Sequence, residues 1–225
     1  MLRIDIITVV PELLDSPLSH SIPGRAVKKG LVQIEVHDLR PYGLGSRLSV
    51  DDYSYGGDAG MVMMVEPVYN CIRDLKAQRP YDEVIYMAPD GEILTQGIAN
   101  ELSLKENLII LCGHYKGIDE RIREHLVTRE ISVGDFVVSG GEIPAALLAD
   151  SIIRLVPGVL TDETSALSDS FQDGLVSPPV YTRPASFNGW DVPEVLLSGN
   201  PKLIRAWQDE QAVQRTKERR PGLLK

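Results

Sequence analysis

Short apolar runs alternate with polar segments of helical spacing through the first two thirds of the chain. Runs of this length that are rich in β-branched residues are typical of buried strands. The expected strands are 2–9, 31–37, 83–88 and 107–112, and the expected helices between them are 67–78 and 94–104. Alternating strands and helices predict an α/β fold with a largely parallel sheet.

Residues 132–144 read SVGDFVVSGGEIP, in which an apolar run precedes two glycines and a proline. The pattern predicts a buried strand, a turn at Gly140–Gly141 and a buried helix over 145–155, with Pro144 near its start. Such an arrangement is typical of a ligand-binding crevice at the end of a sheet. The alternative is a tight connection between strand and helix that binds nothing.

Two other predicted strands also end in glycine-containing loops. Residues 113–121 read GHYKGIDER after the strand at 107–112, and Asp119 can cap a following helix. Pro89-Asp90-Gly91 is a turn signal after the strand at 83–88. If the strands are parallel neighbours, the three loops form one pocket.

Length and composition exclude several classes of protein. The chain has 225 residues, of which 43% are hydrophobic, and a net charge of −9, which argues against indiscriminate binding to nucleic acid. Cys71 and Cys112 have no metal-ligand spacing and fit a reducing cytoplasm better than a disulfide framework. No signal peptide or transmembrane run is expected.

The pattern indicates two domains, over 1–160 and 174–225, joined by a flexible linker over 161–173 that is acidic and rich in small residues. A helix is expected over 201–219. From residue 205 onward the chain has six basic residues and three acidic ones, which suggests that this end contacts RNA. The alternative is that these charges only form the solvated face of a helix. The polar segment 51–60 is expected to be a long loop, either a mobile lid or a plain surface loop.

Six motifs occur in an order that identifies a family. They are LCGHYKGIDER at 111–121, SVGDFVVSGGEIP at 132–144, RLVPGVL at 154–160, DSF at 169–171, YTRP at 181–184 and LLSGN at 196–200. Together they closely resemble the bacterial tRNA (guanine-37-N(1))-methyltransferases, members of the trefoil-knotted SPOUT methyltransferases. The resemblance implies a knot at the C-terminal end of the first domain, a small, mainly helical tRNA-binding domain, and a homodimer with active sites at the subunit interface.

The resemblance also implies the reaction and its residues. Methylation of guanine at N1 needs a base for the N1 proton and a cation or donor for the charge that builds on the carbonyl oxygen. Matched to the family, Asp169 is the general base and Arg154 stabilises that oxygen. From the sequence alone, Arg154 could equally be a cation at a helix C-terminus, and Asp169 a linker residue or an N-cap.

The methyl donor implied by the family is S-adenosylmethionine. Its expected cradle is built from the three loops. The residues are Tyr86, Met87, Ala88, Pro89, Gly91, Gly113, Tyr115, Ser132, Val133, Gly134, Phe136, Val138, Gly140, Gly141 and Pro144.

The chain departs from its relatives at a few positions. His114 and Lys116 stand where relatives commonly carry arginine and glutamate, and Asp58 and Ala59 interrupt a glycine run in the segment 51–60. The glutamate is associated with a requirement for Mg²⁺, which leaves the metal dependence of this chain open. Lys116 either changes donor or metal binding or extends harmlessly into water.

Two other functions fit parts of the pattern. One is a knotted methyltransferase with a different RNA target, and the other is an RNA-binding protein that keeps the pocket without the chemistry. The YTRP and LLSGN motifs argue against the first, and the presence of both Arg154 and Asp169 argues against the second.

Overall fold

The computed structural model describes residues 1–57, 59–161 and 169–224. The chain divides into two compact units, Met1–Thr161 and Asp162–Lys225. Most of the predicted linker falls on residues 162–168, which lie outside the described residues.

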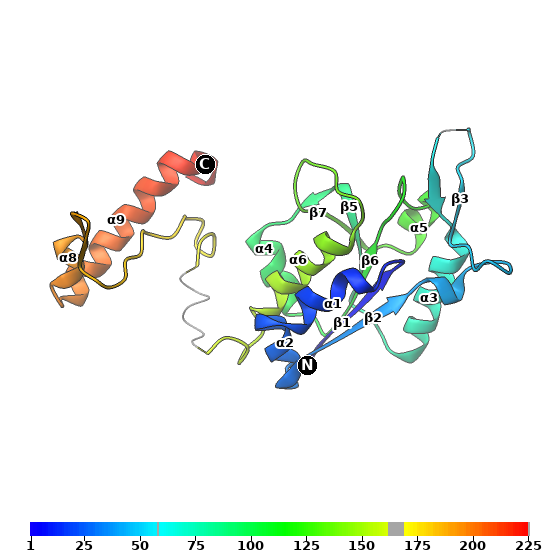
Figure 1. The fold of residues 1–225 in the computed structure, drawn as a ribbon, viewed down its shortest axis with the longest axis horizontal. Coiled ribbons are helices and arrows are strands. Elements are labelled where there is room, and N and C mark those ends of the chain that lie inside the picture. The colour runs from blue at the N-terminus through cyan, green and yellow to red at the C-terminus, as the bar shows by residue number, and fades with distance from the viewer. Residues whose placement is uncertain (58, 162–168, 225) are drawn as a thin grey trace. The chain divides into compact units, whose positions relative to one another are not determined.

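The first unit alternates strands and helices, as Figure 1 shows. Its strands are β1 (Leu2–Thr8), β2 (Val32–Asp38), β3 (Asp51–Tyr53), β4 (Met61–Met63), β5 (Glu83–Ile93), β6 (Asn107–Cys112) and β7 (Arg129–Ser132). Its helices are α1 (Glu12–Ser19), α2 (Ser21–Lys28), α3 (Val65–Gln78), α4 (Gln96–Ser103), α5 (Glu120–His125) and α6 (Glu142–Ile153), with a 3-10 turn at Arg40–Tyr42.

Five strands form one parallel sheet in the order β2-β1-β6-β5-β7. Successive side chains of a strand point to opposite faces, so β1 buries Ile4 and Ile6 in one core and Ile7 in another. Helices α1, α2, α4 and α6 cover the first face, and α3 and α5 cover the second. The predicted α/β class with a mostly parallel sheet is therefore confirmed.

The prediction that a turn at Pro89-Asp90-Gly91 ends the strand is wrong. The strand continues to Ile93, and its pairing with β7 shifts between Met87 and Glu92. The Pro89-Asp90-Gly91 sequence thus interrupts the ladder without ending the strand. An irregularity of this kind bends the strand and re-aims its side chains, which is common beside binding sites.

Three other boundaries differ from the sequence prediction. Residues 136–138 are not a buried strand but a loop with exposed side chains, because a short apolar run has no periodicity that separates strand from loop. Helix α6 begins at Glu142, three residues early, since a proline in the first helical turn breaks no hydrogen bond. The segment 51–60 is also not a plain loop, because its first three residues form β3, which pairs antiparallel with β4 directly after the segment.

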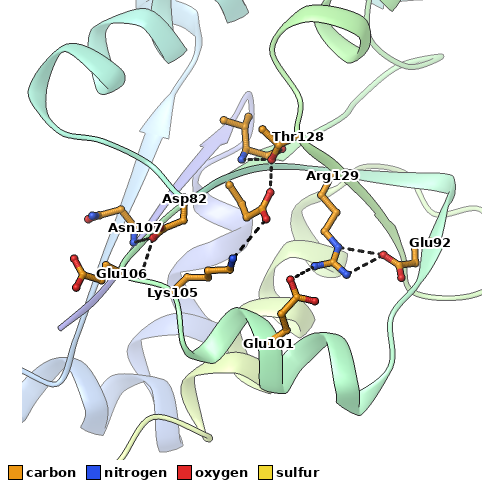
Figure 2. Close-up of polar contacts among 10 residues, drawn as sticks. Asp82, Glu92, Glu101, Lys105, Glu106, Asn107, Thr128 and Arg129 are labelled. Carbon is orange, nitrogen blue, oxygen red and sulfur yellow. Dashed lines mark hydrogen bonds and ion pairs between the residues drawn. The ribbon is translucent and has the colours of Figure 1, made fainter.

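Ion pairs and hydrogen bonds fix the sheet edge beside β7, as Figure 2 shows. Arg129 of β7 binds Glu92, beyond the register shift of β5, and Glu101 of α4. Asp82 accepts hydrogen bonds from the backbone N–H groups of Glu106 and Asn107, where β6 begins. These contacts hold β5, β6 and β7 in the register that aligns their carboxyl ends.

The second unit is small, and its longest element among the described residues is a helix. It contains a hairpin of β8 (Ser186–Phe187) and β9 (Trp190–Asp191), then α8 (Glu194–Leu197), α9 (Pro201–Arg219) and a 3-10 turn at Pro221–Leu224. Asn200 caps α9, whose bounds match the prediction. Among the described residues, no helix is both long and apolar enough to cross a bilayer.

Candidate active site

A pocket of about 490 Å³ lies beside the register shift within β5 and the ends of β6 and β7. This is within the usual size of small-molecule sites. Fourteen of the fifteen residues predicted to cradle a donor line it: Tyr86, Met87, Ala88, Pro89, Gly113, Tyr115, Ser132, Val133, Gly134, Phe136, Val138, Gly140, Gly141 and Pro144. The segments expected to converge do so, although the first of them, Pro89-Asp90-Gly91, is part of β5 and not a loop.

Gly91 is the exception, because it is not a lining residue. A Cβ on Gly91 would lie 2.7 Å from the backbone of Glu130 and Ile131, so glycine is needed here for the close approach of β5 to β7. Strand packing by itself therefore accounts for a glycine at this position.

The Gly140–Gly141 turn lies directly against the loop after β6. Gly141 N donates to Gly113 O at 2.8 Å, and a Cβ on Gly141 would lie 2.8 Å from Cys112 Cα. Its φ of −77° is available to any residue, so space and not backbone conformation requires glycine at this position. The exposed Phe136 and Val138 line the same pocket, which accounts for apolar side chains outside the core.

Sequence reasoning missed the charged side of the pocket. Arg123 of α5 lines it and binds Glu130 of β7, with Nε–Oε1 at 2.7 Å, and Asp90 of β5, with Nη2–Oδ2 at 2.9 Å. Its guanidinium also lies 5.7 Å from the centre of the Tyr86 ring. Burial raises the pKa of Tyr86 to about 12, so its phenol is a neutral group at physiological pH. The sequence did not predict this cluster, because Arg123, Asp90 and Glu130 do not recur at a spacing typical of a known motif.

The loop 113–117 ties the pocket to the β3–β4 hairpin. Lys116 N donates to Met61 O at 3.0 Å, and Met63 N donates to Gly117 O at 3.0 Å. The aliphatic stem of Lys116 packs over Gly60, where a Cβ would lie 2.7 Å from Lys116 Cγ. Both His114 and Lys116 line the pocket, so the two departures from the family pattern occur where a ligand would lie.

The two residues matched to catalytic roles lie in different units. Arg154 is the C-cap of α6 in the first unit. Asp169 is half-buried and is the first described residue of the second unit. Within the described residues, no group of three or more His, Cys, Asp or Glu side chains is arranged to hold a metal ion.

The lining combines apolar side chains with five glycines, Gly113, Gly117, Gly134, Gly140 and Gly141. A lining of this kind can accept a flat, largely apolar ring and offer it backbone N–H and C=O groups. Cys112 lies behind this wall, and burial raises the pKa of its thiol, which makes it an unreactive core residue.

Comparison with known proteins places the chain. The family model described as tRNA (Guanine-1)-methyltransferase TrmD matches residues 2–225. A tRNA (guanine-N(1)-)-methyltransferase of Cytophaga hutchinsonii is 62% identical over 99% of this chain and 94% of its own. A protein of the same name from Flavobacterium johnsoniae is 60% identical over 99% of both chains. Another, from Porphyromonas gingivalis, is 60% identical over 100% of both chains. The chain belongs to the tRNA (guanine-1)-methyltransferase family.

Proposed function

We infer that the protein transfers a methyl group from S-adenosylmethionine to N1 of guanosine 37 in tRNA, beside the anticodon. The observation that carries this inference is the pocket beside β5 and the ends of β6 and β7, which is lined by fourteen of the fifteen residues expected from the family resemblance to bind the donor. Relatives covering the whole chain bear the name tRNA (guanine-N(1)-)-methyltransferase. A cytoplasmic location follows from a tRNA substrate.

Asp169 is proposed as the general base and Arg154 as the group that stabilises the developing oxyanion. When bound, S-adenosylmethionine supplies an electrophilic methyl group. The guanine N1–H must be lost as the N1–methyl bond forms, and a carboxylate within hydrogen-bond reach can take that proton. The negative charge then grows on the guanine carbonyl oxygen, and a guanidinium stabilises it most in the transition state.

A homodimer with shared active sites explains how residues of two units act together. Nothing in one chain requires Asp169 to serve its own pocket, because the partner subunit could supply it. The trefoil knot is part of the same proposal. It is supported by the path of the chain, which leaves β7 on the outer side of β5 and returns at Gly141 to the loop after β6.

The RNA is proposed to contact the second unit. Lys217, Arg219 and Arg220 are exposed at the end of α9 and just after it, in a segment that is basic while the chain as a whole is acidic. The phosphate groups of RNA bind to clusters of basic side chains of this kind.

Transfer of labelled methyl from S-adenosylmethionine to tRNA transcripts tests the function. Two transcripts that differ only in guanosine or adenosine at position 37 are compared. Label should enter only the guanosine transcript, and nuclease digestion should recover it as 1-methylguanosine. Equal labelling of both transcripts would overturn the target.

A further inference from the structure

Glu142 is a buried carboxylate to which neither the fold nor the proposed chemistry assigns a role. It is the first residue of α6 and only 1% exposed. Burial of a carboxylate is costly unless hydrogen bonds or charges compensate it. A position at a helix N-terminus offsets part of the cost through the helix dipole. A hydrogen bond from the Thr8 side chain supplies further compensation.

One oxygen of Glu142 is fixed by β1. Thr8, which is fully buried, donates its hydroxyl to Glu142 Oε1 at 2.7 Å. The same hydroxyl oxygen accepts from Val10 N at 2.9 Å, so its orientation is set from both sides. Glu142 is thus anchored to the end of a central strand across 134 residues of sequence.

The other oxygen faces two residues that line the pocket. Glu142 Oε2 lies 3.8 Å from His114 Nε2. A Cβ on Gly140 would lie 2.3 Å from the same Oε2 and 2.8 Å from the His114 ring, so the carboxylate, the glycine and the imidazole are in direct contact. Glu142 does not line the pocket itself but lies immediately behind the wall.

We propose that Glu142, held by Thr8, is a positioning residue that fixes the Gly140–Gly141 turn and the His114 ring for binding of the methyl donor. The proposal rests on the function inferred above. Thr8 supplies a rigid reference point in the sheet, and Glu142 transfers that position to two loops that come from different strands. Glu142 is not a catalytic residue, because it is separated from the ligand space by Gly140 and His114.

The positioning role predicts a particular kinetic pattern. Loss of the Thr8–Glu142 hydrogen bond leaves a buried carboxylate without its anchor, and such losses are worth about tenfold or more in an equilibrium constant. Thr8→Val should therefore raise both the dissociation constant and the KM of S-adenosylmethionine by about tenfold. The kcat at saturating donor should stay within about threefold, because binding and not transition-state contact is lost.

Conservative variants separate positioning from simple instability. Thr8→Ser keeps the hydroxyl and should restore most of the parental affinity. Glu142→Gln keeps an acceptor for Thr8 and should bind the donor more tightly than Glu142→Leu. Tyr81→Phe is the matched control, because it also removes one hydroxyl that donates to a buried carboxylate, Asp5, at 2.8 Å, but far from the lining residues. It should lower the free energy of unfolding and leave donor affinity unchanged.

Calorimetry with S-adenosylmethionine in the absence of tRNA, together with urea unfolding of each variant, tests the proposal. The parent must first bind the donor, and failure there would refute the function instead of the positioning role. If the parent binds, parental affinity in Thr8→Val would overturn the proposal. Equal loss of affinity in Thr8→Val and Tyr81→Phe would also overturn it, because affinity would then follow global stability.

Discussion

At the scale of single residues, the sharpest electrostatic feature is the buried Asp5 on β1. Its oxygens accept hydrogen bonds from Arg3, His37 and Tyr81 at 2.6–2.8 Å. Burial by itself raises the pKa of Asp5, but the hydrogen bonds, that from His37 foremost, outweigh burial and lower the pKa to about 2 from 3.8. The network therefore stabilises the charged carboxylate in the folded state.

This depressed pKa predicts acid sensitivity. The folded-state value lies below the unfolded one, so the stabilisation is complete above about pH 4 and is lost as the pH falls towards about 2. It is worth about 2 kcal/mol. The advantage of the parent over Asp5→Asn in urea-unfolding free energy should shrink by that amount between pH 5 and pH 2. An advantage that stays constant with pH would contradict the assignment.

Lys116 carries a prediction particular to this chain. An ammonium group cannot ligate a cation, whereas the glutamate expected at this position from the family resemblance can. Lys116→Glu should therefore make methyl transfer more dependent on Mg²⁺, which titration of the initial rate with Mg²⁺ measures. Lys116→Gln is the control, since it removes the charge without adding a carboxylate. Superimposable titrations for Lys116→Glu and the parent would show that this position has no part in metal dependence.

At the scale of elements, the turn before α6 depends on the absence of a side chain at Gly141. Gly141→Val would place its Cβ within about 2.8 Å of the Cys112–Gly113 backbone, which cannot move without displacing β6. We expect donor affinity to fall at least tenfold, a loss that calorimetry measures. Gly97→Val, in α4, where a Cβ would meet only Thr95 Oγ1 at 3.7 Å, serves as a control for a glycine outside the pocket. Unchanged affinity in a folded Gly141→Val protein would remove the turn from the site.

Helix α9 shows how burial changes a prediction made from charge alone. Arg215 is one of the six basic residues from which the sequence analysis predicted an RNA-contacting end. The structure places Arg215 differently, because it is half-buried and its Nε, among the described residues, has no hydrogen-bond partner. Lys217 and Arg219 are exposed and are the better test of RNA contact.

Replacing Lys217 and Arg219 with alanine should weaken tRNA binding and flatten its dependence on salt. Each lost phosphate contact reduces the log–log slope by about 0.7 for a single strand or 0.9 for a duplex. Filter binding over a range of salt concentrations measures the slope, and calorimetry should show unchanged donor affinity. Arg215→Ala is the contrasting variant and should act mainly on stability. Parental tRNA affinity and slope in the double variant would place the RNA surface elsewhere.

Elements whose signals are local were predicted closely. Strand β6 matches its predicted bounds, and α9 does so because Asn200 and Pro201 mark its start. The exposed run 136–138 and the continued strand through Pro89 were missed, because both depend on contacts between segments distant in sequence. Arg123 and Glu142 were missed for the same reason, since their partners Asp90, Glu130 and Thr8 share no sequence spacing with them.

At the scale of the whole molecule, the proposed reaction assigns the donor pocket to the first unit and the base to the second, and the homodimer proposal takes these two units from different chains. Asp169→Asn keeps the shape of the side chain and removes the base, so homodimers should lose about 10²–10⁴-fold in single-turnover rate. Gly141→Val homodimers should also lose activity, because the substitution impairs binding of the donor. A heterodimer of the two variants contains one composite site in which an intact pocket meets an intact Asp169 from the other chain. Tagged heterodimers purified by tandem affinity should therefore recover up to about half of the parental activity. If each site were built within one chain, both sites of the heterodimer would carry a defect. Activity no higher than that of the two homodimers would then reject the shared site.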